Sequence, residues 1–215
     1  MPYVAETAKQ YAVCMPSQPD ARLDLREVTR GILRAEVVRR AVVYLDEHGF
    51  DESTVDEIAA AVGISSRSFF RYFPTKEDVV LGDLVPMGRL IEAELLVRPA
   101  GEDPWTALRA SLAPLASTAD SDTPNVLRSS RVALSTPALR ARNLQRHSGW
   151  ADYLAPIVTD RLEGTSDAAI AAEALVQSAL ACLYVGTRAW VTGDAERPYA
   201  EMLDIAFTAV APLTA

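Results

Sequence analysis

The stretch that decides the fold is residues 49–78, which read GFDESTVDEIAAAVGISSRSFFRYFPTKED. Thr54 stands three residues before Glu57. This is the spacing of a capping box, in which each side chain bonds the backbone of the other residue at the start of a helix. The helix that begins there is predicted over 55–62. Gly63 ends it, because glycine adopts the left-handed backbone of a turn without a steric penalty.

A second short helix follows the first at once. Ser65 is a favourable N-cap for a helix over 66–73, and Pro74 ends that helix. Ala59 is small where two helices must cross closely, and Ile64 is placed to fill the corner between them. Two short helices joined by a tight turn have the dimensions of a helix-turn-helix.

One face of the second helix carries hydroxyl groups and arginines. Phe69 and Phe73 lie on the opposite face, where we expect them in the core. Hydroxyls near a helix start hold phosphates, and arginine pairs with guanine edges in the major groove of DNA. The DNA-binding candidates from this segment are Ser65, Ser66, Arg67, Ser68 and Arg71.

The chain here resembles the TetR (tetracycline-repressor-like) family of bacterial transcription regulators. The resemblance rests on residues 49–59, 62–65 and 69–77, covers about residues 25–80 closely, and extends further only in helix count and order. It implies a three-helix DNA-binding domain joined to a helical domain that dimerises and binds a small effector.

The resemblance also implies roles for single residues. Tyr72 and Lys76 match positions that contact DNA phosphates, and Thr54 matches one that often touches the DNA backbone. Phe70 departs from the pattern, because the family usually has a tyrosine whose hydroxyl meets a phosphate. Arg30 is either a further phosphate contact or a solvated surface residue.

The remaining sequence also predicts helices, and no stretch alternates between apolar and polar residues as a half-buried strand does. Proline, glycine and capping residues divide it, with Ser166 as the cap of the long apolar helix. The fold class is therefore all-α, with about nine helices. They are predicted over 29–48, 55–62, 66–73, 76–97, 104–118, 124–134, 137–162, 167–192 and 198–210.

We divide the chain into a loose arm over 1–22, a helix-turn-helix domain over 23–75, and an effector-binding and dimerisation domain over 76–215. The helix predicted over 76–97 would join the two domains directly. It could carry a small tilt from an effector pocket to the DNA-binding helix.

Charge and composition limit the partners, cofactors and cellular location that we expect. The 215 residues carry a net charge of −8, which taken whole disfavours nucleic acid, but residues 65–76 hold three basic side chains and no acid. No apolar run approaches the roughly 20 residues of a membrane helix, and the N-terminus is not a secretory signal. Cys14 and Cys182 have no metal-ligand or disulfide spacing, so we expect a reducing cytoplasm and no metal or cofactor.

The predicted body contains two arginines within apolar helices, Arg131 and Arg188. Each must find an anion, an internal acid or a route to water. The run over 131–140 resembles a TetR subgroup that includes mycofactocin-system regulators and resembles acyl-CoA-responsive members, so an acyl or amphipathic anion is one option for the effector. The candidate effector residues are Trp105, Leu108, Leu112, Leu127, Arg131, Trp150, Leu154, Tyr184 and Arg188.

The last two helices are more apolar than a single helical layer usually hides. Two such helices from each chain would make a four-helix dimer interface and place two DNA-reading helices about one DNA turn, roughly 34–36 Å, apart. The candidate interface residues are Leu175, Leu180, Leu183, Trp190, Leu203 and Phe207.

Two function classes fit these observations. The first is a homodimeric, ligand-responsive regulator, most simply a repressor that a small molecule releases from a palindromic operator. The second is a helical enzyme or lipid carrier whose helix-turn-helix is only packing. The chain has no GxSxG, HExxH or glycine-rich phosphate loop, so the first class is favoured and no enzyme is predicted.

Overall fold

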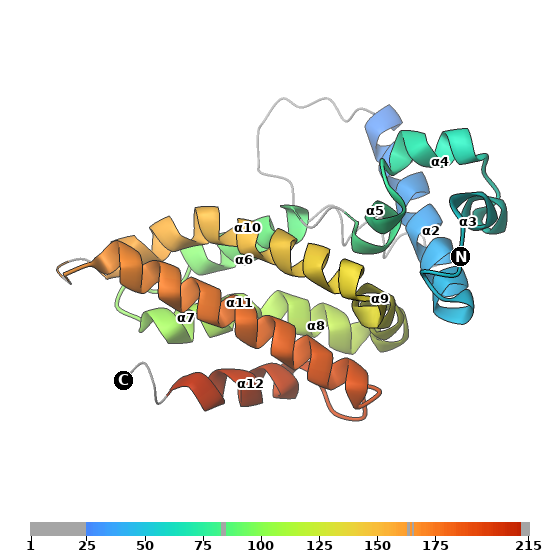
Figure 1. Ribbon diagram of the computed structural model, residues 1–215. Helices are drawn as coiled ribbons and strands as arrows, with labels where there is room; N and C mark the ends of the chain where they lie inside the picture. The colour runs from blue at the N-terminus through green and yellow to red at the C-terminus, as the bar shows by residue number, and fades with distance from the viewer. Residues whose placement is uncertain (1–24, 83–84, 163, 165, 212–215) are drawn as a thin grey trace.

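The computed structural model describes residues 25–82, 85–162, 164 and 166–211, and within them the regular structure is helical (Figure 1). The predicted arm over 1–22 lies outside the described residues. The helices are α2 (Leu25–His48), α3 (Val55–Val62), α4 (Ser66–Tyr72), α5 (Lys76–Leu81), α6 (Val85–Leu96), α7 (Pro104–Ser111), α8 (Ala113–Ser121), α9 (Thr123–Ser135), α10 (Pro137–Arg161), α11 (Ala168–Thr192) and α12 (Tyr199–Val210).

The local signals around the helix-turn-helix are confirmed. The backbone N–H of Thr54 donates to Glu57 Oε2 at 2.8 Å, and the N–H of Glu57 donates back to Thr54 Oγ1 at 3.3 Å. Gly63 ends α3 with a φ of +81°. Ser65 caps α4 by accepting a hydrogen bond from the N–H of Ser68. These contacts fix the angle between α3 and α4.

The core of the N-terminal unit extends beyond that unit. Phe69 of α4, Phe73 directly after α4 and Ile58 of α3 are fully buried against the inner face of α2, as predicted for the two phenylalanines. Val132 of α9 and Leu139 of α10 belong to the same buried cluster. The helix-turn-helix therefore shares its core with helices from the C-terminal part of the chain.

A second core holds the C-terminal helices together. The long helices α10 and α11 pack side by side, and α12 packs along α11 (Figure 1). Gly186 allows the closest approach, because a Cβ atom there would lie 2.8 Å from Leu203 Cδ2 and 3.3 Å from the carbonyl oxygen of Met202. Cys182 is buried in this core, as a small apolar residue would be.

The prediction of one helix over 76–97 is wrong. The chain forms α5 and α6 instead, and α5 ends at Gly82, whose φ of +60° and ψ of −161° cannot continue a helix. Pro86 then stands in the first turn of α6, where its missing N–H costs nothing. No continuous rod therefore links the helix-turn-helix to the body.

The prediction of one helix over 104–118 is also wrong, because this stretch forms α7 and α8, and α8 continues to Ser121. The helical segment breaks between α7 and α8 at Leu112, because Pro114 lacks the N–H that would bond the carbonyl four residues earlier. Ser166 does not cap α11, since that position belongs to Asp167, which has a φ of +61° and no side-chain cap bond.

The expectation that no apolar run approaches the length of a membrane helix is wrong for α11. This helix is long and apolar enough to cross a membrane by length and composition alone, and only a third of its most apolar window is buried within this chain. It contributes its buried face to the second core. Its other face lies exposed and still carries apolar side chains such as Ile170 and Val185.

Two glycines give a matched test of the backbone argument. Replacing Gly63 by Ala should lower the free energy of unfolding by about 1 kcal/mol, because its φ is positive. Replacing Gly31 by Ala should raise it by about 0.5–1 kcal/mol, because Gly31 lies inside α2 with open space around it. Urea denaturation of both variants checks this, and equal effects would contradict it.

Candidate functional site: a DNA-binding surface and an arginine-lined pocket

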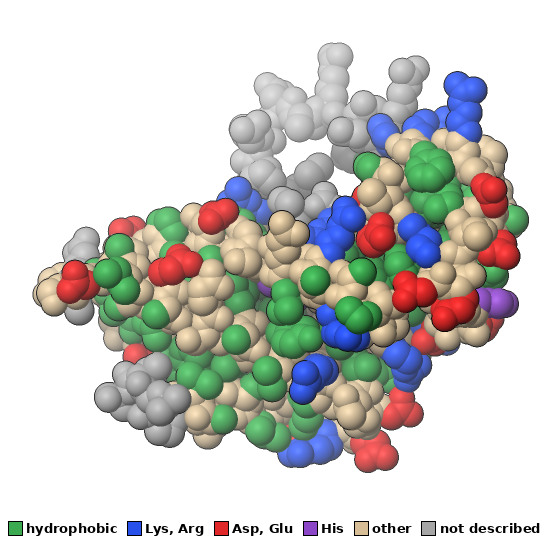
Figure 2. All heavy atoms as spheres, viewed as in Figure 1, with side chains coloured by type: hydrophobic (Ala, Val, Ile, Leu, Met, Phe, Trp, Pro, Cys, Tyr) green, Lys and Arg blue, Asp and Glu red, His purple; other side chains and the backbone are tan. Residues whose placement is uncertain are grey.

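The outer face of α4 is open to solvent. Arg67 and Arg71 are exposed there, and no ion pair holds either of them within the part of the chain that the structure describes. Phe70 lies on the same helix with 52% of its surface exposed, which is unusual for a large apolar side chain. Figure 2 shows Lys and Arg side chains at the end of the molecule where α2 begins and α4 lies.

Two arginines flank the one tyrosine of α4. The guanidinium of Arg71 lies 5.1 Å from the centre of the Tyr72 ring, and that of Arg30, from α2, lies 5.9 Å from it. Arg71 Nη2 also donates to the Tyr72 hydroxyl at 3.4 Å. The helices α2 and α4 thus present these cations together around one half-buried aromatic ring.

Several predicted DNA-binding hydroxyls already have partners. Thr54 Oγ1 donates to Glu57, Ser65 Oγ donates to Ser68 Oγ, and Ser66 Oγ donates to Asp56 Oδ1. Their first role in this structure is to fix the ends of α3 and α4. A hydroxyl oxygen that donates one bond retains the capacity to accept another.

The ammonium group of Lys76 is bound to the protein itself and is not free for a DNA phosphate in this structure. Its Nζ donates to the carbonyl oxygens of Phe50 and Ser53 at 2.7 Å and 2.9 Å and lies 4.1 Å from the centre of the Phe50 ring. The side chain is partly buried and ties the start of α5 to the loop before α3. Here Lys76 stabilises the unit that presents α4.

Replacing Lys76 by Met should lower the free energy of unfolding by about 2 kcal/mol, because two partly buried carbonyls lose a charged donor. The matched control is Arg67→Met, which removes the same charge from an exposed site and should stay within about 0.5 kcal/mol of wild type. Guanidinium denaturation of both variants measures the difference, and equal stabilities would rule out the structural role of Lys76.

The structure divides the predicted effector residues into two groups. One group is packed in the second core with at most 7% of its surface exposed, and Leu127 packs partly buried against that core. Its members are Trp105, Leu108, Leu112, Trp150 and Leu154. Tyr184 is half-buried, whereas Arg131 and Arg188 are exposed. The sequence could not separate these groups, because core residues and pocket-lining residues share the same apolar periodicity.

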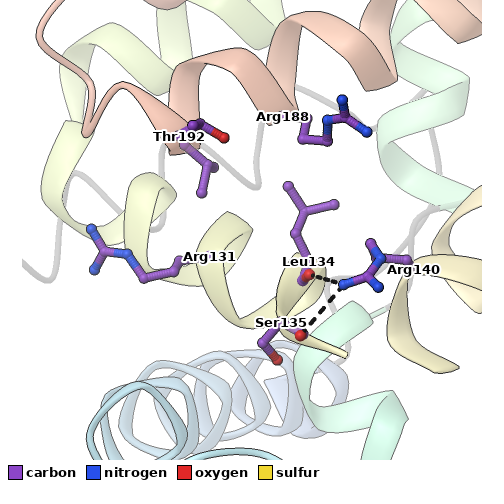
Figure 3. Close-up of a pocket in the computed structure, with 7 residues that line it drawn as sticks. Arg131, Leu134, Ser135, Arg140, Arg188 and Thr192 are labelled. Atoms are coloured by element: carbon purple, nitrogen blue, oxygen red, sulfur yellow. Dashed lines mark hydrogen bonds between the residues drawn. The ribbon is translucent and has the colours of Figure 1, made fainter. Parts of the chain in front are cut away.

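The two arginines line a pocket of about 440 Å³ between α9, the start of α10 and the end of α11. Figure 3 shows Arg140 and Arg188 on one side of it and Arg131 across from them, with its guanidinium turned away. Sequence reasoning missed the other lining residues, although several lie in the run over 131–140. They are Leu134, Ser135, Arg140, Val191 and Thr192.

Acidic residues hold the guanidinium of Arg131 in that position. Arg131 Nη2 lies 2.7 Å from Asp194 Oδ1, and its Nη1 lies 3.5 Å from Asp46 Oδ2 of α2. Arg128 also approaches Asp46, at 3.4 Å. Arg131 therefore joins one wall of the pocket to the first helix of the DNA-binding unit.

Two buried polar atoms of α10, where it packs against α6, were not predicted either. His147 and Tyr153 of α10 each bury a polar atom, Nδ1 and the hydroxyl oxygen, that has no hydrogen-bond partner within the described structure. Gly88 of α6 faces Tyr153 and Trp150, and a Cβ atom there would overlap the Tyr153 hydroxyl. Burial first, and the nearby charge of Arg146 second, lower the pKa of His147 to about 4.

Because its pKa is lowered in the folded state, His147 resists protonation that the unfolded chain accepts below about pH 6.5. Its stabilising contribution is complete above that pH and is lost as the pH falls toward 4. From pH 7 to pH 5 the loss should be about 2 kcal/mol. Urea denaturation at both pH values checks this. His147→Gln should lose about 2 kcal/mol less than wild type over that interval, and an identical loss would contradict the assignment.

The predicted dimer residues lie inside the chain's own second core. Leu180, Leu183, Trp190, Leu203 and Phe207 are buried there, and Leu175 is partly buried against it. Side chains already buried within one chain cannot supply the accessible surface of a dimer contact. Apolar residues occupy most positions of α11, so periodicity alone could not tell its inner face from its outer face.

The arrangement defines a class, a helix-turn-helix DNA-binding regulator with a helical second domain. Comparison with known families agrees with this. Residues 37–82 match the model described as bacterial regulatory proteins, tetR family, and residues 102–215 match the model described as the MftR C-terminal domain. The chain belongs to the TetR family of transcriptional regulators, and it is not an enzyme.

Two curated relatives fit this assignment. The chain is 32% identical to the transcriptional regulator TcmR of Streptomyces glaucescens over 163 residues, which cover 73% of this chain and 70% of TcmR. It is also 32% identical over 124 residues to MftR of Mycobacterium tuberculosis, a protein named for the transcriptional regulation of mycofactocin biosynthesis. This match covers 58% of this chain and 63% of MftR.

Solved structures share the fold at low sequence identity. FadR of Bacillus subtilis, solved in complex with stearoyl-CoA, has a TM-score of 0.56 and 17% identity, over 81% of this chain and 95% of FadR. FadR of Bacillus halodurans has a TM-score of 0.57 and 16% identity, over 82% and 93%. These likenesses confirm the all-α architecture with an N-terminal helix-turn-helix.

Proposed function

We propose that this regulator is a homodimeric repressor that inserts α4 into the major groove of a palindromic operator and leaves it when a small molecule binds the helical domain. One observation carries the DNA-binding assignment. Arg67 and Arg71 project from α4 with no acidic partner among the residues that the structure describes, and the hydroxyls and buried phenylalanines of this unit hold the helix rigidly. Arginines held in this way suit direct reading of guanine edges.

The same surface supplies phosphate contacts. Arg30 and Tyr72 stand beside Arg71 and are placed to meet the DNA backbone. Thr54, Ser65, Ser66 and Ser68 retain acceptor or donor capacity at the ends of α3 and α4. Phe70 offers an apolar surface in place of a hydroxyl and lacks that phosphate bond.

Operator binding tests the assignment directly. Arg67→Ala and Arg71→Ala should each weaken binding to the operator near the protein's own gene by about 1–3 kcal/mol and relax sequence preference. Fluorescence anisotropy with labelled DNA measures the affinity at several salt concentrations. The matched control is Arg197→Ala, which removes an exposed positive charge beside α12 and should bind as wild type does. Unchanged affinity in both α4 variants would refute the assignment of α4.

The dimer contact that we propose uses the outer faces of α11 and α12. These faces expose Val185 and Ile205 at 51% and 49%. The small residues Ala181 and Ala174 are also exposed on α11, about one and three turns before Val185. Small residues let two helices approach closely, and covering the exposed apolar side chains favours association. The match to a family of typically dimeric regulators supports this use of the surface.

Val185→Glu should convert the dimer to a monomer at micromolar concentration, because two-fold symmetry brings the new charges into one apolar contact. Leu96→Glu, a matched change at an exposed leucine of α6, should remain dimeric. Sedimentation equilibrium distinguishes the two states. A Val185→Glu dimer of wild-type strength would show that this face is not the interface.

The effector that we propose is a small amphipathic anion that binds in residues 76–215, with residues 23–75 as the DNA-binding unit. The exposed Arg131 and Arg188 at one pocket favour a negative group. A related fold, FadR of Bacillus subtilis, was solved with stearoyl-CoA, so an acyl-CoA is one candidate within this class. As a regulator of transcription, the protein would act in the cytoplasm.

A further inference from the structure

The arginine-lined pocket has an unbalanced charge. Its lining contains three arginines and no acidic side chain. Arg140 donates to the carbonyl oxygens of Leu134 and Ser135, which carry no net charge. Arg188 has no ion-pair or hydrogen-bond partner within the described residues. The pocket therefore holds two arginines whose charges no carboxylate of the described residues offsets.

The size and polarity of the pocket restrict its ligand. A volume of about 440 Å³ suits a small molecule, and the hydroxyl of Thr192 can donate to the same acceptor as the guanidinium groups. The hydroxyl of Ser135 already donates to the carbonyl oxygen of Val132. Arginine forms paired hydrogen bonds with phosphate and carboxylate groups. An anion with two or more negative charges is the ligand that this lining recognises.

The pocket is also connected to the DNA-binding unit. Arg131 lies on the pocket wall, and its guanidinium pairs with Asp46 in α2 and with Asp194 in the turn between α11 and α12. Its side chain is 44% exposed, so a change of partner is not blocked by close packing. An anion between Arg140 and Arg188 would compete with Asp46 for this guanidinium.

We propose that this pocket binds a multiply charged anion, of the phosphate or polycarboxylate type, and that Arg131 leaves Asp46 for the anion and thereby loosens the DNA-binding unit. This inference rests on the proposed function, because it specifies where the negative group of the effector binds and how binding reaches α2. The route runs through α9 and a side chain, which fits the break between α5 and α6.

The test measures operator affinity of the full-length protein with sodium pyrophosphate or sodium chloride at equal ionic strength. Pyrophosphate should weaken operator binding of the wild type by about 5-fold, the change that exchange of one partly exposed ion pair can supply. Arg188→Gln should bind the operator normally without pyrophosphate and lose the response. Arg197→Gln, a matched control at an exposed arginine outside the pocket, should respond as wild type does.

A second variant isolates the connection to α2. Asp46→Asn should bind the operator more weakly without pyrophosphate, and pyrophosphate should then add little. Calorimetry should show pyrophosphate binding to wild type and to Asp46→Asn but not to Arg188→Gln. Normal calorimetric binding with no effect on the operator would overturn the connection.

Three further outcomes would overturn the pocket itself. They are no calorimetric binding to wild type, an equal loss of operator affinity in wild type and Arg188→Gln, and dissociation of the Arg188→Gln dimer in sedimentation. The last would assign Arg188 to the subunit contact instead. Failure of the wild type to bind any operator in chloride alone would refute the proposed function, and that result is distinct from all of these.

Discussion

The structure depends on the insertion of α9 and α10 side chains into the core of the DNA-binding unit. Val132 and Leu139 are buried there beside residues of α2, α3 and α4. Burying each should contribute about 1.5–3 kcal/mol, whereas a partly exposed ion pair such as that between Asp46 and Arg131 contributes about 1 kcal/mol or less. Packing therefore holds the two parts of the chain together. The ion pairs are weak enough to be exchanged, so a ligand can move them without unfolding the contact.

A rigid apolar core combined with exchangeable ion pairs suits a regulator. A rigid shared core fixes where α4 stands relative to the body, and in a dimer it fixes the distance between two such helices. Arg142 adds a second link, through Nη2 to Asp78 of α5 at 3.0 Å. Both ion-paired links join α9 or α10 to the helices that carry or support α4, so the body reaches the DNA-binding unit through side chains.

Much of the N-terminal unit could be predicted from the sequence because its signals are local. The capping box of Thr54 and Glu57 and the left-handed turn at Gly63 each depend only on residues close by in the sequence. The structure confirms both features. The continuous helix over 76–97 was wrong because apolar periodicity runs through Gly82, and only the backbone there shows the break. Pro114 was a visible signal for the division of 104–118, but helices also tolerate proline in their first turn.

The predicted effector, dimer and phosphate-contact residues were harder to predict than the helices, because their surroundings are set by tertiary structure. Arg131 and Arg188 could be singled out because arginine is unusual in an apolar helix, and both lie at the pocket. Five of the six predicted dimer residues are buried in the core of their own chain, and Leu175 packs against that core, a burial that apolar periodicity could not distinguish from a subunit contact. Lys76 matched a family phosphate contact, but its two carbonyl partners lie more than 20 residues away in sequence, so no local pattern could predict them.

The most direct test of the account is the operator affinity as a function of the spacing between the two half-sites. A body that holds each DNA-binding unit rigidly, in a two-fold dimer, allows one separation of about one DNA turn. Inserting about five base pairs between the half-sites should therefore reduce affinity to that of a single half-site, because the second α4 then faces the wrong side of the duplex. Equal affinity for both spacings would contradict the account, since it would mean that the DNA-binding units move freely relative to the body.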